Sequence, residues 1–143
     1  MIRVKVAAEL SDELVEAFRL LVPQLSASAS LPDRDALAAI LASPATTILV
    51  AKEDDTIVGT LTLVLFRIPT GTRAWIEDVV VDARARGRGA GEALTREALR
   101  RAASAGARTV DLTSRSERRA AIRMYEKLGF RRRDTNIYRY DLE

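Results

Sequence analysis

Residues 79–94 read VVVDARARGRGAGEAL, and this stretch decides the fold prediction. Its three valines are typical of a buried strand, while the spacing of Leu94, Ala98 and Leu99 indicates a helix. Between them lies the Arg/Gly loop, defined as residues 84–91, with three arginines and three glycines. A strand that enters a helix through such a loop forms an anion site, because backbone N–H groups and the positive helix end converge there. Arginines add charge-assisted hydrogen bonds to phosphate oxygens.

The glycine spacing excludes the two common nucleotide-binding loops. A Walker A loop ends in Gly-Lys-Ser or Gly-Lys-Thr, whereas Gly91 is followed by Glu92 and Ala93. A Rossmann loop is spaced G-x-G-x-x-G, whereas Gly87, Gly89 and Gly91 are spaced G-x-G-x-G. The predicted strands that precede the loop also lack the βαβ order of a Rossmann unit.

Hydrophobic periodicity around the loop predicts an α+β fold. The expected strands are 2–7, 46–52, 57–68, 75–81, 109–113, 130–133 and 137–142, and the expected helices run from Ser11 to Pro23, from Pro32 to Pro44, and over 90–105 and 117–128. Three consecutive strands, 46–52, 57–68 and 75–81, form an antiparallel meander because their connections are too short for parallel crossovers. We expect one domain over residues 1–143, with a mixed, mostly antiparallel central sheet flanked by about four helices.

The amino-acid composition restricts the chemistry. The 143 residues suffice for one domain with its own core. The chain contains no cysteine, and therefore no disulfide, thiolate metal site or thiol nucleophile. It also contains no histidine, the commonest general base and metal ligand. Catalysis would therefore have to use carboxylates, tyrosine, serine or threonine hydroxyls, lysine or arginine, the backbone or a cofactor. We expect no metal site.

The charge is distributed unevenly along the chain. Residues 1–82 carry a net charge of −5 and residues 83–143 a net charge of +8, with 20 arginines against 3 lysines overall. The sign therefore changes just before the Arg/Gly loop. The excess of arginine over lysine favours bidentate binding of phosphate or carboxylate. No apolar run is long enough to span a bilayer, and the N-terminus lacks the apolar run of a signal peptide. We expect a cytoplasmic protein with no membrane partner.

Two segments resemble the GNAT (Gcn5-related N-acetyltransferase) superfamily. The run RGRGAG, residues 86–91, matches R/Q-x-x-G-x-G, the acyl-CoA pyrophosphate loop of that family. The run MYEKLGF, residues 124–130, resembles the L-Y-x-x-x-G-F signature, and its tyrosine follows Arg86 by 39 positions. The predicted order of strands and helices is also similar, so the resemblance covers nearly the whole chain and implies a GNAT-like fold.

The resemblance implies acetyl-CoA as co-substrate and assigns its binding residues. Backbone N–H groups of residues 87–92 would hold the pyrophosphate, and the strand at residues 79–81 would run along the pantetheine arm. The implied binding residues are Val79, Val80, Val81, Arg86, Gly87, Arg88, Gly89, Ala90, Gly91 and Glu92. The valines are at the same time ordinary residues of a buried strand.

The resemblance also suggests an acid and a base. Tyr125 would protonate the departing thiolate, with an inward-packed core tyrosine as the alternative. Glu77 matches the position of a glutamate base in several members of the family, acting directly or through water. Asp78 is the second candidate, and strand alternation places it on the opposite face. A rim position or an ion pair with an arginine is the alternative for Glu77.

One departure from the family pattern concerns the helix that contains Tyr125. Many members place an asparagine seven residues before the tyrosine, and this chain has Arg118 there. The resemblance therefore does not carry over to this chain the polar contact that the asparagine makes near the thioester. Arg115, Arg118 and Arg119 either meet an anionic ligand or lie in solvent at the start of the helix, where the helix dipole disfavours positive charge.

The sequence thus predicts an acetyl-CoA-dependent N-acetyltransferase that moves an acetyl group directly to a primary amine of a small molecule or a protein. The alternative is a non-catalytic CoA-binding module of the same fold. Nucleic acid is not an expected partner, because few aromatic residues are available for stacking. The acceptor stays open, although the acidic first half favours a cationic amine, and the chain is expected to be a monomer or a homodimer.

Overall fold

The computed structural model describes residues 1–143, which form two compact units, Met1–Thr113 and Ser114–Glu143. The first unit contains β1 (Ile2–Val6), α1 (Asp12–Leu25), α2 (Arg34–Ala42), β2 (Thr46–Glu53), β3 (Thr56–Ile68), β4 (Gly71–Val81), the 3-10 turn η1 (Ala83–Ala85), α3 (Ala90–Ser104) and β5 (Val110–Asp111). The second unit contains α4 (Arg119–Lys127). None of the four helices combines the length and apolar character needed to cross a membrane.

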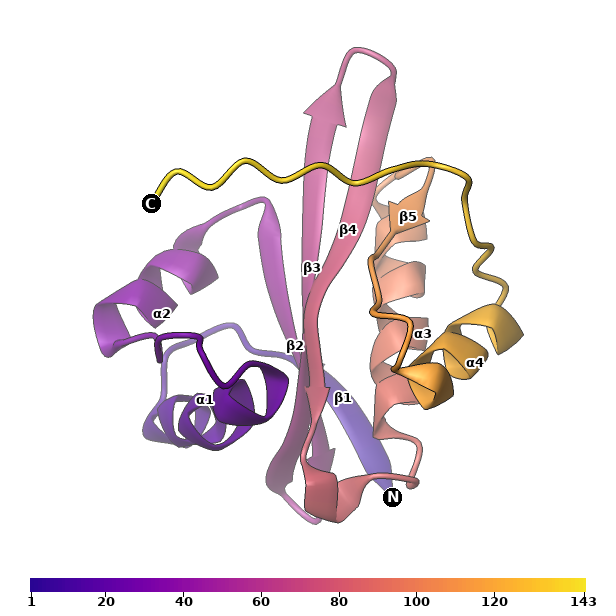
Figure 1. Cartoon of the computed structure of the whole chain (residues 1–143). Helices are drawn as coiled ribbons and strands as arrows, with labels where there is room; N and C mark the ends of the chain where they lie inside the picture. The colour runs from indigo at the N-terminus through magenta and orange to yellow at the C-terminus, as the bar shows by residue number, and fades with distance from the viewer. The chain divides into compact units, whose positions relative to one another are not determined.

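The five strands form one mixed sheet in the order β1-β2-β3-β4-β5 (Figure 1). The first four strands pair antiparallel, and β5 pairs parallel to β4. The parallel pair follows from α3, which carries the chain back along the sheet before β5 begins. This topology confirms the predicted α+β class with a mixed, mostly antiparallel sheet and four helices.

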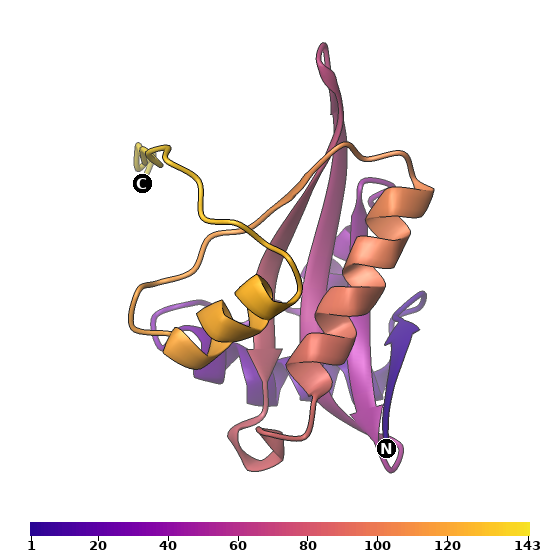
Figure 2. The same ribbon diagram turned by 90° about the vertical axis from the view of Figure 1, so that its right-hand side faces the viewer.

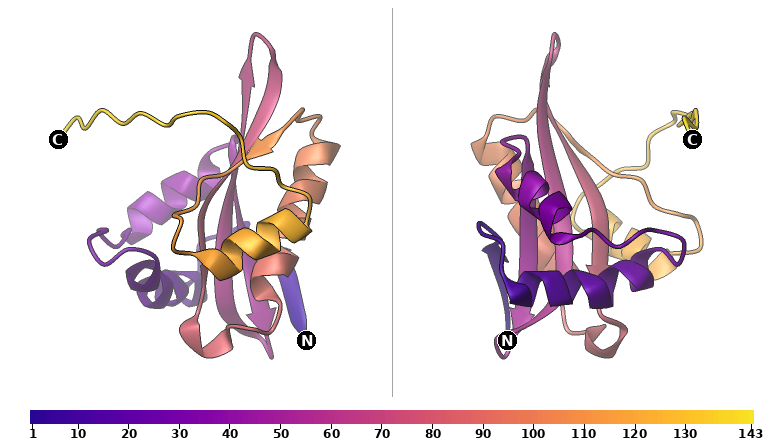
Figure 3. Two further views of the ribbon diagram at one scale, coloured as in Figure 1. Left: turned by 45° about the vertical axis from the view of Figure 1, so that its right-hand side comes forward. Right: turned by 90° about the vertical axis from the view of Figure 1, so that its left-hand side faces the viewer.

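Helices cover both faces of the sheet in the first unit. Figures 1 and 3 show α1 and α2 on one face, and Figure 2 shows α3 against the other. On the α1 face, Leu14 and Leu21 pack in one cluster with Val50 and Val80. On the α3 face, a Cβ at Gly59 would lie 3.3 Å from Leu94 Cδ1 and 3.1 Å from the Val80 carbonyl oxygen, so glycine allows the helix to approach closely. The strand that leads into the Arg/Gly loop is therefore held from both sides.

Helix α1 continues beyond the predicted end at Pro23. Proline removes only one N–H donor, and the last turn is held by other bonds. The Ser26 backbone N–H donates to the Val22 carbonyl at 3.0 Å, and the Gln24 side-chain N–H donates to the Leu20 carbonyl at 3.2 Å. The extension brings Gln24 into the helix, which becomes important at the site.

The two predicted C-terminal strands, 130–133 and 137–142, are wrong, because the structure has no strand after β5. Apolar and polar residues alternate over 138–142, but the apolar side chains there are exposed, with Tyr138 at 90% and Leu142 at 93%. Alternation only identifies a face that would be buried, whereas a strand also needs a hydrogen-bonded neighbour. Residues 130–142 have no such neighbour in this structure.

Candidate functional site

Asp82 directly follows β4 and holds the first turn of the loop. Its side chain is 9% exposed and caps η1 by accepting a hydrogen bond from the Arg84 backbone N–H at 3.2 Å. The Arg84 guanidinium lies 3.2 Å from the other carboxylate oxygen. Burial by itself raises the pKa of Asp82, but hydrogen bonds from Arg84 and Gln24 outweigh it, so the pKa lies below its usual value. Asp82 is therefore a charged, well-held capping group at neutral pH.

Two glycines give the Arg/Gly loop its backbone path. Gly87 has φ +79° and Gly89 has φ +89°, a left-handed conformation that costs other residues free energy. A Cβ on either would meet nothing within 4 Å, so the requirement comes from backbone direction and the space beside the loop is open. Gly89 is also the N-cap of the 15-residue helix α3, and no side chain caps that end. The loop thus presents an open helix N-terminus, the arrangement that binds anions.

The three arginines of the loop are in different environments. Arg84 pairs with Asp82, and Arg88 pairs with Glu53 at the end of β2 at 2.5 Å. Arg86 is exposed and forms no ion pair. The guanidinium of Arg86, at the first position of the R-x-x-G-x-G motif, is therefore the one in the loop whose charge is not already balanced by a carboxylate.

A β-bulge in β4 separates Glu77 from Asp78. Thr62 lies opposite Glu77 and Thr60 lies opposite Val80, so β4 has one residue more than β3 between these pairs. Asp78 adopts φ +49°, which is uncommon for a residue other than glycine. Directly opposed residues share a face, so Glu77 lies on the same side as Val80, which packs against α1. The predicted simple alternation along residues 77–81 is interrupted, and both carboxylates are exposed.

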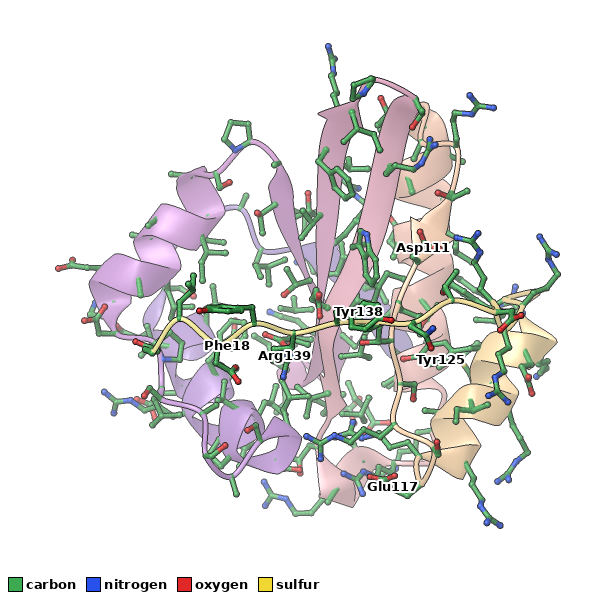
Figure 4. The ribbon with its side chains drawn as sticks, turned by 45° about the horizontal axis from the view of Figure 1, so that its top comes forward. Phe18, Asp111, Glu117, Tyr125, Tyr138 and Arg139 are labelled. Atoms are coloured by element: carbon green, nitrogen blue, oxygen red, sulfur yellow. The ribbon has the colours of Figure 1, made fainter.

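The edge of β4 that faces β5 is paired over only a short length. Val110 lies opposite Ala74 and Asp111 opposite Trp75, and β5 ends there. Figure 4 shows Asp111 at this end of β5. Residues 76–81 of β4 therefore have no strand partner on that side. An open strand edge that leads to an anion-binding loop suits a long ligand with amide groups and a phosphate end.

Tyr125 lies in α4 of the second unit, where the run MYEKLGF forms the helix end (Figure 4). The Phe130 N–H donates to the Tyr125 carbonyl and the Gly129 N–H to the Glu126 carbonyl, both at 3.0 Å. With Gly129 at φ +106°, these bonds form a Schellman cap. The Tyr125 and Phe130 rings pack edge to face, 5.6 Å apart. The Y-x-x-x-G-F spacing is therefore that of a helix cap with its hydrophobic contact.

The phenol of Tyr125 is held in its neutral form. The residue is 8% exposed. Burial raises the pKa of Tyr125, and the nearby positive charge of Arg118 offsets only part of this effect. The hydroxyl is thus protonated at neutral pH and retains a proton to donate.

Arg115, Arg118 and Arg119 lie exposed at the start of α4. The Arg118 N–H donates to the Arg115 carbonyl at 3.0 Å, and Arg118 occupies the N-cap without a side-chain capping bond. No acidic residue lies in the first turn of α4. The positive end of this helix therefore carries additional positive charge, as the sequence predicted.

Two further residues, which no sequence pattern indicated, support the loop. Glu53 holds Arg88, and Gln24 accepts a hydrogen bond from the Ala83 backbone N–H at 2.8 Å. Gln24 lies 59 residues from Ala83, so no local pattern could reveal the contact. Of the predicted residues, the loop, β4 and Glu77 lie together in the first unit, and Tyr125 lies in the second. No group of His, Cys, Asp or Glu side chains is arranged to hold a metal ion.

Comparison with known proteins identifies the class. A sequence model of the acetyltransferase (GNAT) family matches residues 9–130, and the chain belongs to this family. A structure from Agrobacterium tumefaciens assigned as an acetyltransferase has a TM-score of 0.83 and 29% identity, with coverage of 96% of this chain and 99% of that one. No curated protein sequence matches significantly.

Two structures of lower identity share the fold. Glucosamine-6-phosphate N-acetyltransferase from Arabidopsis thaliana has a TM-score of 0.81 and 23% identity, with coverage of 98% of both chains. An aminoglycoside acetyltransferase from an uncultured soil metagenomic sample has a TM-score of 0.82 and 20% identity, with coverage of 99% of this chain and 97% of that one. These two similarities confirm the fold class. The family that the sequence model defines uses acetyl-CoA.

Proposed function

We propose that residues 1–143 form a single acetyl-CoA-dependent N-acetyltransferase domain that transfers acetyl directly to a primary amine. The observation that carries this proposal is the path from β4 into α3. The chain is a member of the GNAT family. In it, two left-handed glycines lead from the open edge of β4 to the uncapped N-terminus of α3. The arrangement suits the pyrophosphate and the amide-containing arm of acetyl-CoA.

The chain's own groups suffice to hold acetyl-CoA. Backbone N–H groups of residues 87–92 would hold the pyrophosphate, and the edge of β4 at residues 79–81, which has no strand partner on the β5 side, would supply main-chain partners for the pantetheine amides. The open space beside Gly87 and Gly89 leaves room for a phosphate close to the backbone. Arg86 adds a charge that no carboxylate of the protein balances.

Arg86→Ala should weaken acetyl-CoA binding about 10- to 100-fold, because a hydrogen bond to a charged group contributes about 1.5–3 kcal/mol. Isothermal titration of acetyl-CoA measures the effect. Arg100→Ala is the matched control, since Arg100 is an exposed arginine of α3 that pairs with Glu97 away from the loop. Equal affinities of the two variants would show that the guanidinium of Arg86 does not contact the ligand.

The reaction needs one proton removed and one supplied. As the neutral amine nitrogen attacks the thioester carbonyl, the N–C bond forms and the C–S bond breaks. Glu77, directly or through water, takes the amine proton, and the Tyr125 hydroxyl gives a proton to the thiolate. We propose direct transfer because the chain has no cysteine or histidine to form or assist an acyl-enzyme.

Glu77→Gln should lower kcat/KM about 100-fold while acetyl-CoA affinity stays unchanged, because the substitution removes the proton acceptor and keeps the shape. Asp78→Asn is the matched control, since it removes one carboxylate at the neighbouring position across the bulge. Steady-state rates with one amine acceptor compare the two variants. A loss confined to Asp78→Asn would assign the base to Asp78 instead.

The acceptor is proposed only as a primary amine. The net charge of −5 over residues 1–82 favours a cationic amine. A thiol-release screen with acetyl-CoA against small polyamines, amino sugars, amino acids and lysine-containing peptides tests the function. Thiol release with at least one class supports it. Acetyl-CoA binding without release across the panel would favour a non-catalytic CoA-binding module.

A further inference from the structure

Gln24, the only glutamine of the chain, uses both ends of its side-chain amide. The oxygen accepts a hydrogen bond from the Ala83 backbone N–H at 2.8 Å. The nitrogen donates to the Leu20 carbonyl at 3.2 Å, within its own helix, and to Asp82 Oδ1 at 3.4 Å. A side chain from the last turn of α1 is thus bonded to the two residues that follow β4.

Asp82 and Ala83 are the residues at which the chain leaves the sheet and enters the Arg/Gly loop. The N–H groups at the start of a helical turn have no partner within that turn. Here Gln24 satisfies the N–H of Ala83, and Asp82 satisfies the N–H of Arg84. Protein acceptors therefore fix the first turn before any ligand binds, which leaves only the later N–H groups of the loop for an anion.

Gln24 also orients the carboxylate that caps this turn. Asp82 Oδ1 accepts from both Gln24 and the Arg84 backbone, while Oδ2 accepts from the Arg84 guanidinium. Loss of the amide would leave the buried carboxylate with one donor fewer and the Ala83 N–H without its partner. Both changes allow the turn to move, and the glycines that follow it offer little resistance.

We propose that Gln24 is a positioning residue that pre-organises the acetyl-CoA loop through Ala83 and Asp82. The inference rests on the proposed function in one respect, the identity of the ligand. Gln24 does not touch the reacting atoms and acts through the backbone of the loop. A loop held in its bound conformation binds its ligand more tightly, because less ordering remains to be done on binding.

Gln24→Ala should raise the Kd of acetyl-CoA about 5- to 30-fold and raise its KM in parallel, while kcat changes by less than about 2-fold. Gln24→Glu should weaken binding as well, because it retains the acceptor for Ala83 but places a second carboxylate beside Asp82. Adding Asp82→Asn to Gln24→Glu exchanges the two groups, and asparagine still serves as a cap. The double variant should therefore bind more tightly than Gln24→Glu alone.

The matched control is Arg19→Ala, which removes an exposed side chain of α1 whose ion pair is with Glu16 on the same helix. Hydrogen exchange of the ligand-free protein over residues 82–90 should be faster in Gln24→Ala and unchanged in Arg19→Ala. If the role of Gln24 is purely structural, Gln24→Ala lowers Tm, but hydrogen exchange at the loop and the Kd of acetyl-CoA stay at wild-type values. That result would overturn the inference. If wild-type protein binds no acetyl-CoA, the proposed function fails and the assignment of Gln24 to that ligand fails with it.

Discussion

Gly89→Glu is expected to abolish acetyl-CoA binding, with a loss of affinity of at least about 100-fold. The substitution puts a carboxylate at the N-cap of α3, where the pyrophosphate would lie. It also forces a residue with a Cβ into φ +89°, which costs about 1–2 kcal/mol. Because nothing lies within 4 Å of that Cβ, the new side chain occupies the space open to the ligand without disturbing the core. Isothermal titration with acetyl-CoA measures the loss.

Gly106→Glu is the matched control for this prediction. Gly106 follows the other end of α3, has φ +81°, and likewise has nothing within 4 Å of a Cβ. The variant therefore carries the same added charge and a similar backbone cost. We expect it to lose stability and to bind acetyl-CoA like the wild type. Equal loss of affinity in both variants would mean that destabilisation, and not occupation of the anion site, explains the effect at Gly89.

Tyr125→Phe is expected to slow the chemical step about 10- to 1000-fold with little change in acetyl-CoA affinity. The substitution removes only the hydroxyl, and the ring contact with Phe130 and the helix cap remain. Turnover should persist, because a thiolate is a good leaving group even without an acid. Single-turnover rates at saturating acetyl-CoA measure the step, and a rate equal to wild type would reject the role of the phenol.

The raised pKa of Tyr125 adds a pH test of the same residue. Unfolding exposes the phenol and returns its pKa to the usual value of about 10. A group whose pKa is raised in the folded state stabilises that state below its unfolded pKa. This contribution is lost as the pH rises through the higher folded pKa. Tyr125→Phe should therefore reduce the loss of Tm at alkaline pH, and an unchanged profile would contradict burial of a neutral phenol.

Features that depend on neighbouring residues could be predicted from the sequence. The glycines at 87 and 89 are recognisable because a left-handed backbone is a local requirement, and the structure places both there. The run at residues 124–130 is recognisable because a Schellman cap needs glycine at one position and an apolar contact on either side of it. These are the same segments that carry the resemblance to the GNAT family.

Features that depend on distant pairing could not be predicted in this way. The bulge at Asp78 exists because β4 has one residue more than β3 between two paired positions, which no period along β4 reveals. Gln24 reaches the loop because α1 continues through Pro23, whereas a proline ordinarily indicates a helix end. The alternation over residues 137–142 predicted a strand, but the sequence does not show whether a partner strand is present.

A single-turnover experiment with excess protein, acetyl-CoA and an amine acceptor from the screen is the most direct test of direct acetyl transfer. We expect free CoA thiol and acetylated amine to appear together in equal amounts, while the intact mass of the protein does not change. Binding of acetyl-CoA without thiol release for any amine would contradict a transferase. Transient gain of one acetyl group by the protein would contradict direct attack of the amine on the thioester.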